Sequence, residues 1–443
     1  MLYCRYQANI LQMSKKVIII GNGIAGITCA RHIRKQSDFD ISVISSESKY
    51  FYSRTALMYI YMGHMKQEHT QPYEDYFWEK NRINLLQERV QKIESSKNSI
   101  VLDTGVGIEY DFLVIASGSR SNKFGWPGQD LQGVQGLYNL QDLQTMEQHT
   151  KDIKHAVVVG GGLIGIETVE MLLSRNIGVT FLIREQSFWN TILPAEESEM
   201  INKIIRHHKV DLQLETELKE IKSNDAGKVT SVITSKGEEL LCGFVALTVG
   251  VSPNIDFVKE SGIDTDKGVL INNNFQTNIK NIFAIGDCAQ FKTPLDGRKP
   301  LEQVWYTGKM HGETAAKNVV GLNAEYQPGH WFNSAKFFDL EYHTYGLVSA
   351  QKREEENWFW WQSKKGEKGL RIVWDKDTLA FKGLNSFGIR IRHEVCNDWL
   401  NDKTPIKTVV NQLRRANFDP EFFKGFEKEF EAAFDHQNIL IKN

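Results

Sequence analysis

Two stretches of the sequence carry glycines at a spacing that suits the binding of a dinucleotide. One reads Gly21-Asn22-Gly23-Ile24-Ala25-Gly26, and the other reads Gly160-Gly161-Gly162-Leu163-Ile164-Gly165. In such a turn the first glycine permits a tight bend, the second lets the backbone approach a pyrophosphate, and the third lets a helix pack closely on a strand. Free N–H groups at the start of that helix would then bind phosphate oxygens. The predicted chemistry is the binding of two nucleotides.

Each turn lies between a strand-like run and a helix-like run. Val17–Ile20 and Ala156–Val159 are apolar runs of the kind buried in parallel sheets, and apolar residues at helical spacing follow each turn. Second strands are expected at Ile41–Ser45 and Gly178–Ile183. Glu47 stands about 20 residues beyond the first turn, where an acid would bind a ribose. The alternative is a glycine-rich connection without a ligand. Because the turns are much further apart than one strand–helix–strand repeat, we expect two doubly wound domains.

Length, composition and charge limit the class of protein. A chain of 443 residues suggests about two to four domains, and 41% hydrophobic with 24% charged residues is typical of a globular protein. The formal net charge of −2 provides no overall basic field for nucleic acid or anionic lipid. No apolar run approaches the ~18–20 residues of a membrane span. We therefore expect neither nucleic acid binding nor a membrane span.

The cysteine pattern argues against a disulfide framework and against a metal site. Five cysteines are far apart and form no Cys-x-x-Cys motif: Cys4, Cys29, Cys242, Cys288 and Cys396. This usage fits a reducing cytoplasm. The first twelve residues lack the apolar centre of a signal peptide, and Met13 could itself be a start, which would make residues 1–12 an extension.

Three further segments, in this order with the two turns, resemble the pyridine nucleotide-disulfide oxidoreductase superfamily of flavoproteins. Tyr110–Gly128 resembles the crossover from the first nucleotide domain, and Val245–Asn254 resembles the return crossover. Thr277–Phe291 resembles the late flavin-binding strand that ends in Gly-Asp. The resemblance covers about residues 15–320. It implies FAD on the first domain and NADH or NADPH on the second.

The resemblance implies an α/β fold with two Rossmann-like, doubly wound, three-layer domains and a C-terminal α+β domain. The expected boundaries are residues 13–122 with 251–328 for the discontinuous FAD-binding domain, 123–250 for the NAD(P)-binding domain, and 329–443 for the C-terminal domain. In the last domain, Arg371–Ile391 reads as a hairpin, and the aromatic residues Phe422, Phe423, Phe426 and Phe430 read as a core stripe. The family often uses this domain as a dimer face, so a homodimer is expected.

The resemblance also implies which residues bind FAD. Arg54 would lie along the pyrophosphate, Glu47 would meet the adenosine ribose, and Asp287 would hydrogen-bond the ribityl chain. The alternative for Asp287 is a helix N-cap. The start of a helix at Val304 and Trp305 would aim N–H groups at the flavin ring. The full set expected at FAD is Gly21, Gly23, Ile24, Ala25, Gly26, Glu47, Arg54, Val90 (through its backbone, beside the adenine), Ala116, Ser117, Gly118, Gly286, Asp287, Val304 and Trp305.

A second set is implied for NAD(P)H. Glu167 matches the position from which family members contact the nicotinamide side, and its alternative is an ordinary acid in the first turn of a helix. Arg184 could meet a 2′-phosphate and Glu185 a 2′-hydroxyl, so NADH and NADPH both stay open, with NADH favoured by the branch described below. The full set is Gly160, Gly162, Leu163, Ile164, Gly165, Arg184, Glu185 and Gly250.

The branch of the family follows from a missing thiol. The cysteine pair after the ribose acid, from which the superfamily takes its name, is absent. The segment Tyr50–Leu57 instead resembles the Pro-Tyr-x-Arg-x-x-Leu segment of ferredoxin, rubredoxin and nitrite reductase flavoproteins. Many relatives continue Leu-Ser-Lys, whereas here Met58 and Tyr59 follow. The missing lysine removes a partner for Glu167, and Tyr59 is the candidate to fill its space.

These features predict an FAD-dependent oxidoreductase in which hydride passes from NAD(P)H to flavin N5 and electrons leave without a thiol relay. The expected acceptor is a small, acidic redox protein of the iron–sulfur kind, because a flavin can release electrons singly. Its docking patch could consist of Lys364, Lys365, Lys368, Arg371, Arg390, Arg392 and His393, which could equally form a solvated rim. The alternatives are an NADH oxidase or nitrite-reductase-type flavin component, and an NAD(P)H-sensing flavoprotein with a binding role.

Overall fold

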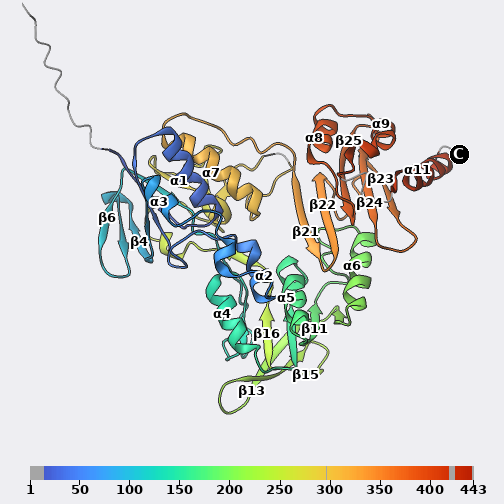
Figure 1. Ribbon diagram of the computed structural model, residues 1–443, viewed down its shortest axis with the longest axis horizontal. Helices are drawn as coiled ribbons and strands as arrows, with labels where there is room; N and C mark the ends of the chain where they lie inside the picture. The colour runs from blue at the N-terminus through green and yellow to red at the C-terminus, as the bar shows by residue number, and fades with distance from the viewer. Residues whose placement is uncertain (1–13, 296, 419–424, 442–443) are drawn as a thin grey trace, which may run out of the picture. The chain divides into compact units, whose positions relative to one another are not determined.

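The computed structural model describes residues 14–295, 297–418 and 425–441, and the chain divides into two compact units (Figure 1). The first unit comprises Met1–Arg54, Gln67–Arg120 and Ser252–Gln327, and the second comprises Thr55–Lys66, Ser121–Val251 and Pro328–Asn443. The extension before Met13, Cys4, Phe422 and Phe423 lie outside the described residues.

The first unit is built on a five-stranded parallel sheet with the order β19-β7-β1-β2-β3. Its strands are β1 (Lys16–Ile20), β2 (Asp40–Ile44), β3 (Ile83–Leu86), β7 (Phe112–Ile115) and β19 (Ile282–Ala284). The predicted strand Val17–Ile20 is confirmed and buried throughout, as expected when both faces of a parallel sheet are covered. Strand order reverses at β1, so the turn after β1 lies at the switch point where doubly wound sheets bind ligands.

Helices α1 (Ile24–Gln36) and α7 (Trp305–Val319) lie side by side in the first unit (Figure 1). Two glycines of α7 allow this contact, since a Cβ at Gly308 would lie 3.2 Å from Ile24 and a Cβ at Gly312 would lie 2.5 Å from the Ala25 carbonyl. Gly308 lies against Ile24 at the start of α1, and Gly312, further along α7, lies against Thr28 and Cys29, further along α1. The two helices therefore run parallel, with their N-termini together.

The remaining elements of the first unit surround this core. They are the antiparallel sheet of β4 (Val90–Glu94), β5 (Ser99–Leu102) and β6 (Gly107–Glu109), the parallel pair β18 (Val269–Ile271) and β20 (Ala289–Phe291), helix α3 (Tyr76–Lys80), and the 3-10 turns η2 (Gln67–Thr70), η3 (Ser95–Lys97), η4 (Asp256–Val258) and η5 (Gly286–Cys288). The 3-10 turn η1 (Arg54–Ala56) and strands β8 (Ser119–Ser121) and β17 (Val251–Pro253) lie where the chain passes from one unit to the other.

The second unit repeats the parallel pattern with the order β12-β11-β10-β16-β9. The second glycine turn again follows the strand at which the order reverses, β10. The elements are β9 (Val134–Gln135), β10 (His155–Val159), β11 (Gly178–Ile183), β12 (Asp211–Leu214) and β16 (Phe244–Leu247), the antiparallel β13 (Leu218–Ser223), β14 (Val229–Thr234) and β15 (Glu239–Leu241), and helices α2 (Leu57–Tyr61), α4 (Leu140–His149), α5 (Leu163–Ser174) and α6 (Ala195–His207).

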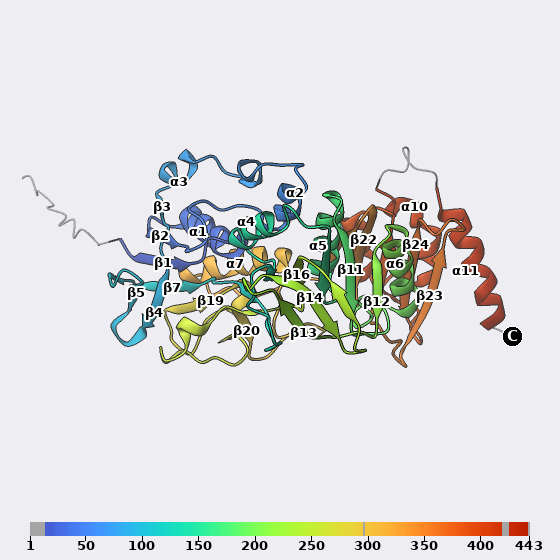
Figure 2. The ribbon, with the colours of Figure 1, turned by 90° about the horizontal axis from the view of Figure 1, so that it is seen from below.

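The C-terminal part of the second unit is an antiparallel sheet with the order β21-β22-β25-β24-β23. Its elements are β21 (Phe332–Phe337), β22 (Leu340–Gly346), β23 (Glu356–Gln362), β24 (Gly369–Asp375), β25 (Phe381–Phe387), α8 (His393–Asn401), α9 (Ile406–Asn411), α10 (Leu413–Ala416) and α11 (Glu427–Ile441), with α11 beside β23 (Figure 2). The predicted hairpin is confirmed, because Trp374 of β24 pairs with Phe381 of β25. Phe426 and Phe430 are buried, which confirms the core reading for the described part of the aromatic stripe.

These sheets confirm the predicted fold class: two doubly wound α/β arrangements followed by an α+β arrangement. Among the described residues, no helix is both long and apolar enough to cross a membrane.

Candidate functional site

The first glycine turn joins β1 to α1, and its three glycines differ in their surroundings. Gly21 has φ +111°, and a Cβ there would lie 2.1 Å from the Ala116 carbonyl oxygen. A Cβ at Gly26 would lie 2.0 Å from the Gly21 carbonyl oxygen, whereas a Cβ at Gly23 would meet nothing within 4 Å. The first and third glycines are thus required by close backbone approach. The second faces open space that a phosphate can occupy.

Predicted FAD contacts from distant parts of the chain gather around this turn. Gly286 has φ +70°, and a Cβ there would lie 3.0 Å from the Cβ of Ala25. Ser119 Oγ donates a hydrogen bond to Asp287 Oδ2 at 3.1 Å, and Gln303 Nε2 donates to Ser119 Oγ at 2.9 Å. The late Gly-Asp turn and the start of α7 are therefore joined beside the start of α1.

Asp287 does not cap an α-helix. It lies inside the 3-10 turn η5, and β20 follows that turn directly. Its half-buried carboxylate accepts a hydrogen bond from the Ser119 hydroxyl. The N-cap alternative is excluded, because there is no following α-helix to cap.

Backbone structure holds three other predicted FAD contacts. Ser117 Oγ donates to the Asn254 carbonyl at 2.7 Å, and the Asn254 N–H donates to the Gly118 carbonyl at 2.9 Å. Gly118 has φ +67°, which favours glycine. Val90 begins β4 and is buried, opposite Leu102 of β5.

Glu47 and Arg54 form a bidentate ion pair. Arg54 Nη1 donates to Glu47 Oε1 at 3.1 Å and Nη2 donates to Oε2 at 2.6 Å, while the Tyr52 hydroxyl also donates to Oε1. Asn22 of the glycine turn donates to the Ser48 carbonyl at 2.7 Å. The predicted ribose acid and pyrophosphate arginine thus lie on one segment, which is tied to the glycine turn through Ser48.

Two helix N-termini meet at this place without a side-chain cap. Gly23 precedes α1 and Val304 precedes α7, neither makes a side-chain capping bond, and neither helix has an acid in its first turn. Each N-terminus carries about half a positive charge, so two parallel helices side by side repel unless an anion lies between or before them. This arrangement fits the pyrophosphate of a dinucleotide.

Trp305 adds a buried donor. Its indole N–H is shielded from solvent and has no hydrogen-bond partner among the described residues. A buried unsatisfied donor costs about 1–3 kcal/mol, which a ligand acceptor can offset. Together with the open space at Gly23 and the uncapped helices, this donor shows that the residues present fit FAD.

The second glycine turn repeats the geometry of the first. Gly160 has φ +109°, and its Cβ would lie 2.6 Å from the Thr248 carbonyl oxygen. A Cβ at Gly165 would lie 2.2 Å from the Gly160 carbonyl oxygen, while one at Gly162 would meet nothing within 4 Å. Leu163 and Ile164 open α5, which has neither a side-chain cap nor an acid in its first turn. The turn offers a second open, positively polarised phosphate site.

Arg184 and Glu185 follow β11 and bond to each other, with Arg184 Nε 2.7 Å from Glu185 Oε1. Arg184 is exposed, and Glu185 is less so. Gly250 has φ +89° and accepts a hydrogen bond from the Asn122 N–H at 3.1 Å. The two residues with opposite cofactor preferences are thus coupled at the end of β11.

Glu167 is the fifth residue of α5, so it is not a first-turn acid. Burial, with a smaller contribution from Glu170, raises the pKa of Glu167 to about 7. No cation contributes to this pKa, which agrees with the missing lysine. Tyr59 lies on α2, which contacts α5 within the second unit, and its ring stacks on that of His64 at 6.2 Å.

The cysteines of the described chain are all buried and unpaired: Cys29, Cys242, Cys288 and Cys396. Burial raises the pKa of each thiol, that of Cys242 to about 12. Cys288, next to Asp287, donates to the carbonyl oxygens of Ile115 and Ile285 at 3.5 and 3.3 Å. A buried thiol that stays protonated is a poor nucleophile, so none of the four is suited to redox exchange.

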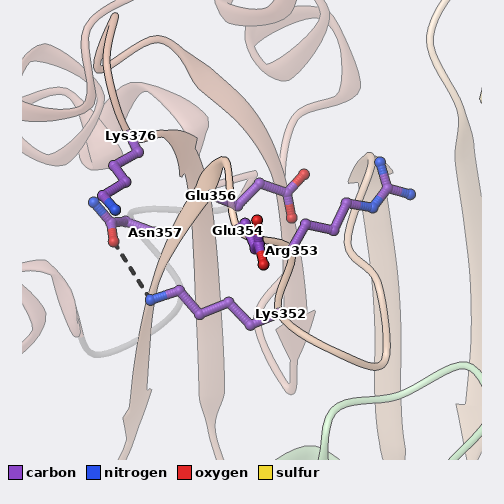
Figure 3. Close-up of a pocket in the computed structure, with 6 residues that line it drawn as sticks. All are labelled: Lys352, Arg353, Glu354, Glu356, Asn357 and Lys376. Atoms are coloured by element: carbon purple, nitrogen blue, oxygen red, sulfur yellow. Dashed lines mark hydrogen bonds between the residues drawn. The ribbon is translucent and has the colours of Figure 1, made fainter.

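A hollow in the second unit lies near the start of β23 (Figure 3). It is lined by charged side chains of both signs and one amide: Lys352, Arg353, Glu354, Glu356, Asn357 and Lys376. None of the predicted cofactor residues lines it, so we assign no cofactor to it. No group of three or more potential metal-ligating acids, histidines or cysteines occurs within residues 14–295, 297–418 and 425–441.

The structure removes Arg371 from the predicted basic patch. Arg371 is only 2% exposed, and its guanidinium bonds Glu197 at 2.5 Å and Glu196 at 2.8 Å. Arg390 makes a bidentate pair with Glu341 at 2.7 and 2.6 Å. Arg371 was wrongly grouped with surface cations, because the alternation of β24 turns it to a face that packs on α6 rather than to solvent.

Sequence reasoning missed Ser119, Gln303 and His311. Ser119 and Gln303 link the Gly-Asp turn to the start of α7, and His311 accepts a hydrogen bond from the Gly286 N–H at 3.1 Å. A polar residue directly after Gly118 and another directly before the start of α7 were the available signals. A lone histidine inside a helix carries no comparable signal.

The sequence and the fold both match known proteins. The family model described as pyridine nucleotide-disulphide oxidoreductase matches residues 15–312, more than half of the chain. The NADH oxidase of Methanocaldococcus jannaschii is 31% identical over 349 residues, which cover 75% of this chain and 76% of that protein.

Two further matches extend this likeness. The ferredoxin–NAD(+) reductase subunit of the benzene 1,2-dioxygenase system of Pseudomonas putida is 27% identical over 323 residues, or 72% of this chain and 78% of that protein. The solved structure of the water-forming NADH oxidase from Lactobacillus brevis, bound to NADH, has a TM-score of 0.80 over 97% of this chain and 100% of that chain, and at 18% identity it shows the shared fold alone. The chain therefore belongs to the pyridine nucleotide-disulphide oxidoreductase family and is an FAD-dependent NAD(P)H oxidoreductase.

Proposed function

We propose that this enzyme delivers the electrons of NAD(P)H from FAD directly to a small acceptor protein of the iron–sulfur kind. The observation that carries the proposal is the state of the cysteines: the four described ones are buried, unpaired and unsuited to a thiol relay. FAD, when bound, supplies a centre that accepts a hydride and can release electrons singly. The likeness to the Pseudomonas putida ferredoxin–NAD(+) reductase subunit supports an iron–sulfur acceptor.

In this proposal the first unit holds FAD through the predicted set of residues. Backbone N–H groups at the starts of α1 and α7 bind the cofactor, with Arg54 at the pyrophosphate and Asp287 at the ribityl chain. The Trp305 N–H donates to a buried acceptor of the cofactor. These residues bind and orient the cofactor and exclude water from it.

The second unit binds NAD(P)H in the same proposal. The N–H groups at the start of α5 bind the pyrophosphate, Glu167 stands at the nicotinamide side, and Tyr59 fills the space of the missing lysine. A carboxylate at Glu167 stabilises the positive charge that develops on a nicotinamide ring as it gives up hydride.

We propose NADH as the preferred donor. The support is the ion pair between Arg184 and Glu185. In this pair the Arg184 guanidinium, which could otherwise bind a 2′-phosphate, is bonded to a carboxylate. Arg184→Ala, assayed with both cofactors, tests this. The proposal expects little change with NADH. A selective loss with NADPH in an enzyme that first preferred NADPH would overturn it, and equal loss with both cofactors would refute any phosphate-reading role.

The domain limits, the assembly and the location belong to the same proposal. We assign residues 13–122 with 251–328 to FAD, 123–250 to NAD(P)H and 329–443 to a C-terminal domain that supports a homodimer, in the cytoplasm. The distribution of the sheets supports these limits, although the segment Thr55–Lys66 groups with the second unit. Light scattering on the purified chain measures the assembly: twice the chain mass supports the dimer, and a monomer refutes it.

A second candidate function is NADH oxidase, favoured by the 31% identity to the Methanocaldococcus jannaschii enzyme. Stopped-flow mixing separates the two. Enzyme reduced by NADH without oxygen is mixed with oxidised rubredoxin, with oxidised ferredoxin or with air-saturated buffer. The proposal expects reoxidation by an iron–sulfur protein to be faster than reoxidation by oxygen. Faster reoxidation by oxygen would make the enzyme an oxidase.

A further inference from the structure

A buried histidine lies directly behind the Gly-Asp turn of the first unit. His311, on α7, is fully buried, and its ring is packed among Phe275, Phe291 and Tyr326 with centroid distances of 4.7, 5.6 and 4.9 Å. An imidazole in aromatic surroundings must have hydrogen-bond partners for both nitrogens, or its burial is costly. Both partners are present.

The two nitrogens of His311 contact two different segments. The Gly286 N–H donates to Nδ1 at 3.1 Å, so Nδ1 is the acceptor and the proton of the neutral ring is on Nε2. Nε2 lies 3.3 Å from Glu302 Oε2. Burial lowers the pKa of His311, which keeps the ring in this neutral form. The ring thus bridges the backbone of the Gly-Asp turn to the carboxylate of Glu302.

Glu302 is itself fixed in place. Tyr326 donates to Glu302 Oε2 at 2.8 Å, and Arg298 donates to Oε1 at 3.1 Å. The Thr307 hydroxyl donates to the Glu302 backbone carbonyl at 2.9 Å. Glu302 lies three residues before Trp305, the first residue of α7, and its backbone is hydrogen-bonded to Thr307 in the first helical turn, so its position helps to set the position of the start of α7.

A second hydrogen-bonded chain links the same two segments on the other side. Gln303, next to Glu302, donates to Ser119, and Ser119 donates to Asp287, next to Gly286. One chain is therefore Glu302–His311–Gly286 and the other is Gln303–Ser119–Asp287. Both connect the start of α7 to the Gly-Asp turn, the two segments predicted to contact FAD.

We propose that His311 is a positioning residue for FAD. Through Nδ1 it fixes the Gly-Asp turn, and through Glu302 it fixes the start of α7, so that the contacts made by Asp287 and Trp305 are set together. The proposal rests on the assignment of FAD to this part of the first unit.

The test compares two amide substitutions, each of which can retain the hydrogen bond of one of the two histidine nitrogens. In His311→Asn the side-chain oxygen can stand near the Nδ1 position and accept from Gly286, whereas in His311→Gln the amide can reach toward Glu302 and leaves the Gly286 N–H without an acceptor. The dissociation constant of FAD is measured on FAD-free protein by quenching of flavin fluorescence. Urea unfolding of the FAD-free protein is measured in parallel, together with the visible spectrum of the bound flavin.

The Asn variant is expected to bind FAD within about twofold of wild type, and the Gln variant about 10-fold more weakly, because a buried donor loses its partner. If both variants bind FAD equally weakly, and in proportion to their loss of stability, His311 acts only as a core residue and the proposal is overturned. Wild-type affinity in the Gln variant would also overturn it.

Ser119→Ala breaks the second chain without changing the aromatic residues packed around His311, so it remains informative if a histidine variant does not fold. We expect weaker FAD binding from it, and a non-additive effect when it is combined with His311→Gln, because both chains hold the same segments. Strict additivity would contradict the shared role. Gly23→Ala is the separate control. Wild-type FAD affinity in that variant would refute the assignment of FAD to this site, whatever the behaviour of the His311 variants.

Discussion

At the scale of single residues, Glu167 is a predicted site residue whose carboxyl pKa lies well above its ordinary value. Burial raises its pKa to about 7, with no cation to oppose the effect. Met58 and Tyr59 stand directly after Leu57, and neither is a cation that could lower this pKa. The carboxyl is thus protonated below about pH 7 and ionised above it, within the range in which the enzyme would work.

Replacing Glu167 should remove a pH dependence. If the carboxylate stabilises the developing positive charge of the nicotinamide, flavin reduction by NADH in wild type rises as pH passes through about 7. Glu167→Gln should give a flat profile, with a rate about 10-fold below the wild-type plateau, equivalent to roughly 1.4 kcal/mol. Stopped-flow absorbance between pH 5.5 and about 8.5 measures it, a range that spans both ionisation states.

Glu170→Gln is the matched control, because Glu170 lies on the same helix but pairs with Lys336 at 3.4 Å. That variant should keep the rise of the rate with pH, displaced slightly to lower pH because the Glu170 charge no longer contributes to the raised pKa of Glu167. A profile that persists in Glu167→Gln would contradict the role given to Glu167.

The sequence predicts those site residues that must be glycine because the backbone of another residue lies too close for a Cβ. The glycines at 21, 26, 160 and 165 stand where a Cβ would clash, and the spacing alone indicates this. Ser119, Gln303 and His311 could not be found in this way. Their roles arise only when segments far apart in the sequence lie together, and a single chain carries no local sign of that contact.

At the scale of elements, the central feature of the first unit is the parallel pair α1 and α7. Gly308 and Gly312 let the helices approach closely, and their uncapped N-termini lie together. The sequence predicted each helix start separately. It could not predict that the two starts would be adjacent, because this depends on how the late segment returns to the first sheet.

The two glycines at the start of α1 should separate binding from folding. Gly23→Ala adds a Cβ to open space at an ordinary φ of −68°, so the protein should fold normally and lose FAD affinity by about 10-fold or more. Gly26→Ala places a Cβ 2.0 Å from the Gly21 carbonyl oxygen, so stability itself should fall by about 1–3 kcal/mol.

Fluorescence titration with FAD and urea unfolding of FAD-free protein distinguish the two effects. The same loss of stability in both variants would show that Gly23 is also required for packing, contrary to its surroundings in the structure.

At the scale of the whole molecule, a buried ion cluster joins the part of the second unit that contains the second glycine turn to the C-terminal sheet of that unit. Arg371 of β24 bonds Glu197 of α6, and Asn385 of β25 donates to the same carboxylate at 2.7 Å. The rings of Trp358 and Trp360 lie 4.8 and 5.4 Å from the guanidinium. The C-terminal sheet is therefore fixed to α6. Its strands were predicted from alternation, but this attachment was not.

Arg371→Met should be strongly destabilising, because it leaves the Glu197 carboxylate buried without its cation. We expect a loss of about 3–5 kcal/mol in the free energy of unfolding, measured by urea titration of tryptophan fluorescence. Arg390→Met is the matched control, since its pair with Glu341 is bidentate but exposed, and should cost at most about 1 kcal/mol. Equal effects of the two changes would contradict a structural role for the buried cluster.

If electrons pass through this enzyme without a thiol, the flavin is the only group that NADH reduces, and the stoichiometry of reduction measures this. FAD-loaded enzyme is titrated with NADH in the absence of oxygen while the flavin absorbance is followed. A flavin alone stores two electrons, so we expect complete bleaching at one NADH per flavin and no thiolate–flavin charge-transfer band. Uptake of two NADH per flavin, or the appearance of that band, would reveal a redox-active cysteine pair and refute electron transfer without a thiol.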